Sequence, residues 1–176
     1  MRYINLTIPE LCSDDRNNLS VLEIGSADGT FSKMLYDTFF LVECCEVDSN
    51  LAQVTEEQGF KTFDCDFMEI PEYEQFDVAI AIDLLEHILD IKEFANKVSR
   101  SVSKYMIIQI PNRMNQGDPN KKGKFGGHSH CFSALSIQIL FDKWFRILGM
   151  YETEKGDTAR GKEMLIIFER KDNNYH

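Results

Sequence analysis

Residues 21–31 have the sequence Val-Leu-Glu-Ile-Gly-Ser-Ala-Asp-Gly-Thr-Phe, in which an apolar run meets a glycine turn. Residues 21–24 have the β-branched and aliphatic composition of a strand, and apolar residues take helical spacing from Thr30 onward. Gly25 and Gly29 bracket small residues that let the backbone approach a ligand, where a helix N-terminus offers unpaired N–H groups. The stretch predicts a strand, a ligand-binding turn and a helix.

The glycine spacing indicates which nucleotide cofactor fits the turn. A dinucleotide-binding turn needs glycine at its first, third and sixth positions, where this chain has Gly25, Ala27 and Thr30. NAD is therefore disfavoured. The turn instead resembles motif I of class I S-adenosylmethionine-dependent methyltransferases, acid-x-Gly-x-Gly-x-Gly, with alanine in place of the middle glycine. The resemblance implies that Glu23 orients the amino-acid end of this cofactor, and that the turn contacts it through Gly25, Ser26, Ala27, Asp28 and Gly29.

Hydrophobic patterning over the rest of the chain predicts alternating strands and helices. The predicted strands are 21–24, 39–47, 60–65, 76–82, 105–110, 145–155 and 163–171, and the predicted helices are 30–36, 51–58, 91–102 and 133–144. Such alternation predicts an α/β fold, a Rossmann-like, doubly wound, mostly parallel seven-stranded sheet that ends in a C-terminal antiparallel hairpin. We also expect a short helix at 9–16 within a short N-terminal segment, 1–18. Residues 112–127 lack apolar periodicity and predict a long loop on the substrate side.

Length and composition indicate the number of domains, the kind of partner and the cellular location. The chain has 176 residues with 43% hydrophobic content, which predicts one domain over 1–176. The first hundred residues hold 7 Lys and Arg against 21 Asp and Glu, and the last 76 hold 12 against 8. The overall acidity disfavours nonspecific duplex binding. Apolar runs are too short to cross a bilayer, no secretory leader is evident and the cysteine count is odd, so we expect a cytoplasmic protein without a membrane partner.

Carboxylates follow the second and third predicted strands. On the methyltransferase resemblance, Asp48 accepts from the ribose hydroxyls, for which a two-oxygen acceptor is suited, and Glu46 is the second choice for that role. The resemblance further implies that Asp66 accepts from the adenine amino group and that Phe67 offers its backbone N–H to the ring. Alone, strand-end carboxylates are also ordinary turn formers.

The segment 76–87, Phe-Asp-Val-Ala-Ile-Ala-Ile-Asp-Leu-Leu-Glu-His, resembles motif IV of the same family, where the strand end lines the methionine and acceptor sites. Asp83 at that strand end joins the expected cofactor contacts. The segment has neither the Asn/Asp-Pro-Pro-Tyr/Phe of methyltransferases acting on base or glutamine amides nor the Pro-Cys of cytosine-C5 enzymes. The resemblance therefore favours a hydroxyl, carboxylate or amine of a small-molecule or sugar-type acceptor.

Two roles are open for the histidines. If 83–87 is helical, Asp83, Glu86 and His87 share one face, and with His130 they make an oxygen and imidazole set suited to a divalent metal, Mg, Mn or non-haem Fe. That layout resembles small-RNA 3′-terminal ribose 2′-O-methyltransferases and implies an RNA end as acceptor, but Ser129 stands where that family has an acid before the histidine. Alternatively His130 or His87 is a general base and no metal is bound.

The sequence thus predicts a methyltransferase for a small-molecule acceptor, with two alternatives. One is the metal-dependent RNA-end enzyme, and the other is a non-catalytic cofactor-binding or partner subunit with the same fold. Lys121, Lys122 and Lys124 suit an anionic acceptor or a solvated loop equally. Because the segment before the first strand is short, we expect either a large acceptor or closure of the acceptor site by the loop 112–127 or by a second copy in a homo-oligomer.

Overall fold

The structure is a computed structural model that describes residues 18–37, 39, 41–72, 74–112, 129–154 and 162–171. The chain divides into two compact units, the first comprising Met1–Ile80 with Ser101–Ser103 and the second Ala81–Arg100 with Lys104–His176. No helix within the described ranges is long and apolar enough to cross a membrane. Several expectations lie outside the described residues: the helix at 9–16, residues 113–127 of the long loop with their three lysines, and the hairpin turn at 156–161.

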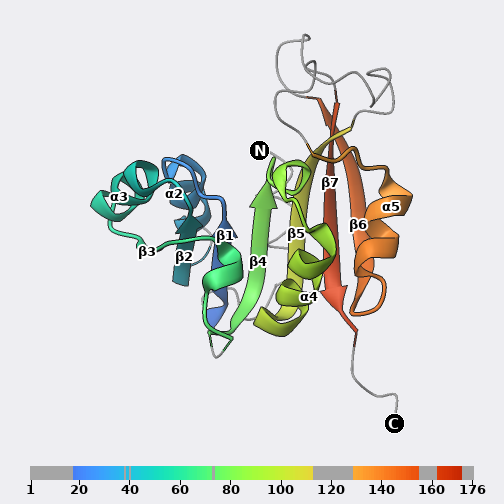
Figure 1. The fold of residues 1–176 in the computed structure, drawn as a ribbon, viewed down its shortest axis with the longest axis horizontal. Coiled ribbons are helices and arrows are strands. Elements are labelled where there is room, and N and C mark those ends of the chain that lie inside the picture. Colours follow the sequence, from blue (N-terminus) through green and yellow to red (C-terminus); the bar gives the residue numbers. More distant parts are fainter. Residues whose placement is uncertain are drawn as a thin grey trace. The chain divides into compact units, whose positions relative to one another are not determined.

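Besides residues 76–80 of a further strand, the first unit holds three parallel strands with two helices packed on them (Figure 1). Its elements are β1 (Ser20–Ile24), α2 (Thr30–Tyr36), β2 (Leu41–Glu46), α3 (Ser49–Glu57), β3 (Lys61–Asp64) and the 3-10 helix η2 (Phe67–Glu69). Strand β1 is almost wholly buried, so both of its faces are covered, as is usual for a parallel strand flanked by helices. The helix predicted at 51–58 begins two residues earlier because Asp48 caps it.

The second unit holds the antiparallel strands and two helices. Its elements are the 3-10 helix η3 (Leu85–His87), α4 (Ile91–Ser101), β5 (Val102–Asn112), α5 (Ala134–Phe141), β6 (Phe145–Glu154) and β7 (Lys162–Arg170). As the helical spacing predicts, α4 buries Phe94 and Val98. The run Met164–Phe168 is buried residue after residue, because β7 lies between β5 and β6 and pairs antiparallel with both.

With β4 (Phe76–Ile82), the strands form a seven-stranded sheet in the order β3-β2-β1-β4-β5-β7-β6. The Rossmann-like α/β fold and its C-terminal antiparallel pair are therefore confirmed. The strand order reverses between β1 and β4, and open α/β sheets bind their ligands at the carboxyl ends of strands near such a reversal. The predicted site residues of the first unit lie at or just after the carboxyl ends of β1, β2 and β3.

Candidate functional site

The turn after β1 has a backbone conformation that L-residues rarely adopt. Gly25 and Gly29 have φ of 77° and 75°, and Ala27 between them has φ 48°. Glycine takes this region freely, whereas alanine pays roughly 1–2 kcal/mol for it. The structure thus shows why motif I has a glycine at the position that Ala27 occupies. A strained residue persists only where its surroundings hold it, and such residues gather at ligand sites.

Two side chains from distant elements hold Ala27. The Ala27 N–H donates to Glu46 Oε2 at 2.8 Å, and the Thr55 hydroxyl donates to the Ala27 carbonyl at 3.1 Å. The Gly25 N–H donates to the Cys45 carbonyl at 2.8 Å, which ties the start of the turn to β2. Next in the turn, the exposed carboxylate of Asp28 accepts from the Thr30 N–H, and this bond lowers the Asp28 pKa. The turn is therefore shaped by β2 and α3.

The structure separates the roles of the two carboxylates at the end of β2. Glu46 is buried, and its two oxygens accept from the Ala27 N–H and from the Asp48 N–H, the latter at 3.0 Å. Asp48 is exposed and caps α3, accepting from the Asn50 N–H at 2.9 Å and the Leu51 N–H at 3.4 Å. Glu46 therefore faces the glycine turn, while Asp48 stabilises a helix. The sequence Asp48-Ser-Asn at the start of a helix carried this capping signal.

Glu23 at the end of β1 is buried and accepts a hydrogen bond from the Ser32 hydroxyl of α2. The Cys44 thiol in turn donates to that hydroxyl at 3.2 Å. Burial raises the pKa of Glu23 to about 7, and the negative charges of Glu46 and Asp28 act in the same direction. At neutral pH this carboxyl group is therefore balanced between its acid and its carboxylate. Its partner Ser32 had no recognisable signal in the sequence.

Asp66 follows β3 and caps η2, accepting from the Met68 N–H at 2.9 Å. Its side chain is exposed, whereas Phe67 beside it is buried and anchors the segment. The first unit therefore brings three carboxylates, Glu23, Glu46 and Asp66, to the carboxyl ends of three neighbouring parallel strands. Carboxylates accept from ammonium, hydroxyl and amino groups, so this set suits a ligand rich in such donors.

In the second unit, the residues after β4 do not form the helical turn that the sequence predicted. Asp83 has φ 49°, its N–H donates to the Gln109 carbonyl at 2.9 Å, and the 3-10 helix η3 begins only at Leu85. Glu86 is buried and His87 is exposed, so Asp83, Glu86 and His87 do not share one helical face. The prediction of a common face was wrong because it presupposed α-helical geometry.

The carbonyl of Glu86 positions His130. It accepts from the Ser129 N–H at 2.7 Å and from the His130 N–H at 3.2 Å. The imidazole of His130 lies against the Phe132 ring, and its Nε2 is 3.3 Å from the Leu89 carbonyl oxygen. A carbonyl oxygen only accepts, so Nε2 is the donor in this contact, and a ring that is protonated at Nε2 alone has an accepting lone pair on Nδ1.

A metal centre would need several of these side chains to converge. Among the described residues, no three His, Cys, Asp or Glu side chains are grouped so as to hold a metal ion. Asp83, Glu86, His87 and His130 all lie in the described ranges and do not make such a cluster. The arrangement therefore lends no support to the metal-dependent alternative.

Solved structures show the same fold. Magnesium protoporphyrin IX methyltransferase from Synechocystis PCC 6803 with bound S-adenosylhomocysteine matches with a TM-score of 0.74 and 17% identity, over 97% of this chain and 82% of that chain. The N-methyltransferase NodS from Bradyrhizobium japonicum, with the same molecule bound, matches with a TM-score of 0.74 and 14% identity, over 97% and 86%. A Thermotoga maritima protein described as a possible histamine N-methyltransferase matches with a TM-score of 0.71 and 18% identity, over 97% and 90%.

Sequence comparison gives the family. No curated protein sequence matches the chain. A family model described as a methyltransferase domain matches residues 2–144, which is most of the chain. That match spans the glycine turn, the carboxylates that follow β2 and β3, and His130. The chain therefore belongs to the methyltransferase-domain family.

Proposed function

We propose that this methyltransferase takes its methyl group from S-adenosylmethionine and transfers it to an oxygen, or an amine nitrogen, of a small-molecule or sugar-type acceptor. The observation that carries the cofactor assignment is the turn at Ala27, held in a strained conformation by Glu46 from the next strand. Protoporphyrin methyltransferase and NodS, which share the fold, were solved with bound S-adenosylhomocysteine, the product of this cofactor.

The donor set of the first unit fits the chemistry of this cofactor. Glu23 would accept from its ammonium group, and Asp66 from its adenine amino group, with Phe67 beside it. Glu46 would accept from the ribose hydroxyls, because each of its oxygens accepts only one backbone N–H in the hydrogen bonds described above and a carboxylate has about four acceptor positions. Asp48, the first choice on sequence grounds, caps α3 through Oδ1, and we propose Glu46 ahead of it because Glu46 also holds the glycine turn.

The cofactor would supply a methyl group bonded to a positively charged sulfonium sulfur. When a nucleophile attacks the methyl carbon, the carbon–sulfur bond breaks and the sulfur departs as a neutral thioether. The protein then has mainly to align the nucleophile and to exclude water, with a base only where the acceptor carries a proton. His130 is the base candidate, since Leu89 occupies its Nε2 and Nδ1 keeps a lone pair. Asp83, with its strained backbone at the end of β4, is proposed to line the methionine end.

A small acceptor is supported by the sequence and by the related structures. The segment after β4 has neither of the motifs that mark base and amide methylation. Proteins with the same fold are described as a magnesium protoporphyrin IX methyltransferase, an N-methyltransferase and a possible histamine N-methyltransferase.

The test is a methyl-transfer assay with labelled S-adenosylmethionine against separate pools of sugars, acids, amines and RNA, each with and without EDTA. We expect transfer to one of the first three pools, unchanged by EDTA. Transfer to RNA alone, abolished by EDTA, would instead establish the metal-dependent RNA-end enzyme. Cofactor binding without transfer to any pool would favour a non-catalytic subunit.

A further inference from the structure

Helix α5 exposes an apolar face. Its sequence Ala-Leu-Ser-Ile-Gln-Ile-Leu-Phe is apolar on nearly every side, and Ile137 and Phe141 are buried. Leu135 and Ile139, four residues apart and therefore on one face, are 64% and 67% exposed. A helix that is apolar all round is normally enclosed by protein. We call Leu135 and Ile139 the α5 ridge.

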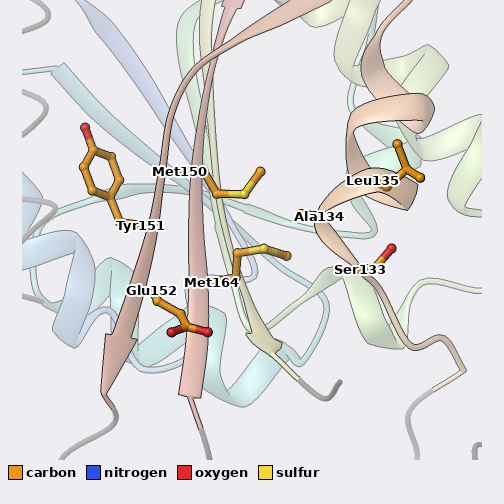
Figure 2. A pocket seen from close by; sticks show the side chains of 7 residues that line it. All are labelled: Ser133, Ala134, Leu135, Met150, Tyr151, Glu152 and Met164. Carbon is orange, nitrogen blue, oxygen red and sulfur yellow. The ribbon is translucent and has the colours of Figure 1, made fainter. Parts of the chain in front are cut away.

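A groove lies on each side of the α5 ridge. The strand-side groove, with a volume of about 680 Å³, runs between Leu135 and the side chains of Met150 and Met164. Figure 2 shows Met150 on β6 and Met164 on β7 pointing toward α5, with Glu152 further along β6. The helix-side groove, with a volume of about 540 Å³, lies between α5 and α4. A projecting ridge between two grooves can fit the ridge and grooves of a second protein surface, as the shape complementarity of an interface requires.

The two grooves differ in charge. Glu152 lines the strand-side groove, which lies at the N-terminal end of α5. Lys92 and Lys143 line the helix-side groove, and Lys143, just beyond the C-terminal end of α5, holds its ammonium group 4.9 Å from the Trp144 ring centre. Of these charged residues, Glu152 lies beside the N-terminal end of α5 and Lys143 just beyond its C-terminal end, so a second copy turned by half a revolution brings these two opposite charges together.

We propose that the α5 ridge and its two grooves form the interface of a two-fold symmetric homodimer in which the two α5 helices pack antiparallel. Antiparallel packing places Leu135 of one copy against Ile139 of the partner subunit. It also brings Lys143 of each copy to Glu152 of the partner subunit, so the ion pair forms twice, as an isologous interface requires. A ligand small enough for one groove would leave the ridge in water, whereas a second copy covers the ridge and both grooves.

Sedimentation velocity of the full chain over a concentration series tests the interface. We expect a dimer for the parent protein, and for Ile139→Glu a dissociation constant raised by roughly 30-fold or more, the effect of losing a buried anchor. Ile139 is exposed in the single chain, so this variant should keep its helical circular dichroism. Val54→Glu is the matched control, because Val54 is also an exposed apolar residue on a helix, in α3, and should leave the dimer unchanged.

Charge reversal tests the antiparallel arrangement separately. Lys143→Glu alone and Glu152→Lys alone should each weaken the dimer by roughly 10-fold, and the double variant should recover most of the affinity. A monomeric parent, or equal dissociation constants for the parent and Ile139→Glu, would overturn the dimer. A double variant as weak as the singles would overturn the pairing of Lys143 with Glu152.

Discussion

The turn after β1 and the segment around His130 are held in different ways. In the first unit, side chains from β2 and α3 bind the turn: Glu46 accepts from the Ala27 N–H, and Thr55 donates to the Ala27 carbonyl. In the second unit, backbone holds the side chain, because the carbonyls of Glu86 and Leu89 fix the main chain and the ring of His130. Side-chain substitutions can therefore loosen the glycine turn, whereas at His130 a substitution removes the imidazole and leaves the backbone hydrogen bonds to Glu86 in place.

The largest effect is expected at His130. If its Nδ1 accepts the acceptor's proton, His130→Ala lowers kcat by roughly 100- to 1,000-fold and leaves the affinity for S-adenosylmethionine nearly unchanged. His87→Ala is the matched comparison, since His87 is an exposed imidazole on the neighbouring η3 helix. Steady-state kinetics with the acceptor found in the pool assay measure both. Unchanged kcat in His130→Ala would remove it as the base, and a loss in His87→Ala alone would move the role there.

Near the glycine turn, the largest expected effect is the pH dependence of stability caused by Glu23. Its pKa of about 7 in the folded protein, against an ordinary 4.5, means that the folded state retains a proton that the unfolded chain loses between these values. Stability is then full below the unfolded pKa and falls as pH rises toward 7, by an amount on the order of 3 kcal/mol.

Urea unfolding across that pH interval measures the fall, and Glu23→Gln should flatten it. The exposed Glu56→Gln serves as the control that keeps the parent slope. An ammonium group beside Glu23 would favour its ionised form, so cofactor affinity should rise with pH in the parent and not in Glu23→Gln. Identical pH profiles for parent and Glu23→Gln would show that this carboxyl group is not the one that titrates.

Substitutions at Glu46 and Asp48 distinguish the proposed ribose contact from the helix cap. Glu46→Ala removes the acceptor of the Ala27 and Asp48 N–H groups and the proposed ribose partner, so the affinity for S-adenosylmethionine should fall roughly 30-fold. Asp48→Ala removes a helix cap and should cost about 1 kcal/mol of stability with little change in affinity. Calorimetric titration and thermal unfolding of both variants check the pair. The reverse pattern would return the ribose role to Asp48.

The smallest effect is expected at Ala27 itself. Ala27→Gly relieves the strain at φ 48° and should stabilise the protein by roughly 0.5–1 kcal/mol, a rise in Tm of a few degrees. Ala52→Gly within α3 is the control and should lower Tm, because glycine in a helix costs about 1 kcal/mol. A lower Tm for Ala27→Gly would mean that the positive φ carries no strain that glycine relieves.

The sequence predicted the strands and helices well because apolar periodicity is strong, as in 76–82, which is β4 as predicted. On the methyltransferase resemblance it ranked Asp48 above Glu46 for the ribose, but it did not show that Asp48 caps α3 or that Glu46 accepts from the Ala27 N–H. It misjudged Asp83, Glu86 and His87 because spacing alone does not distinguish an α-helical turn from a strained residue followed by a 3-10 helix. The sequence did not predict that the α5 ridge is exposed. An apolar helix predicts burial, but it does not tell whether the same chain or a second chain buries it.

We propose that the first unit forms an S-adenosylmethionine site before any acceptor is present. Isothermal titration of the purified protein with S-adenosylmethionine tests it most directly. We expect saturable binding at one site per chain, weakened in Glu46→Ala and retained in Asp48→Ala. No heat of binding to a folded parent protein, or binding that Glu46→Ala leaves unchanged, would contradict it.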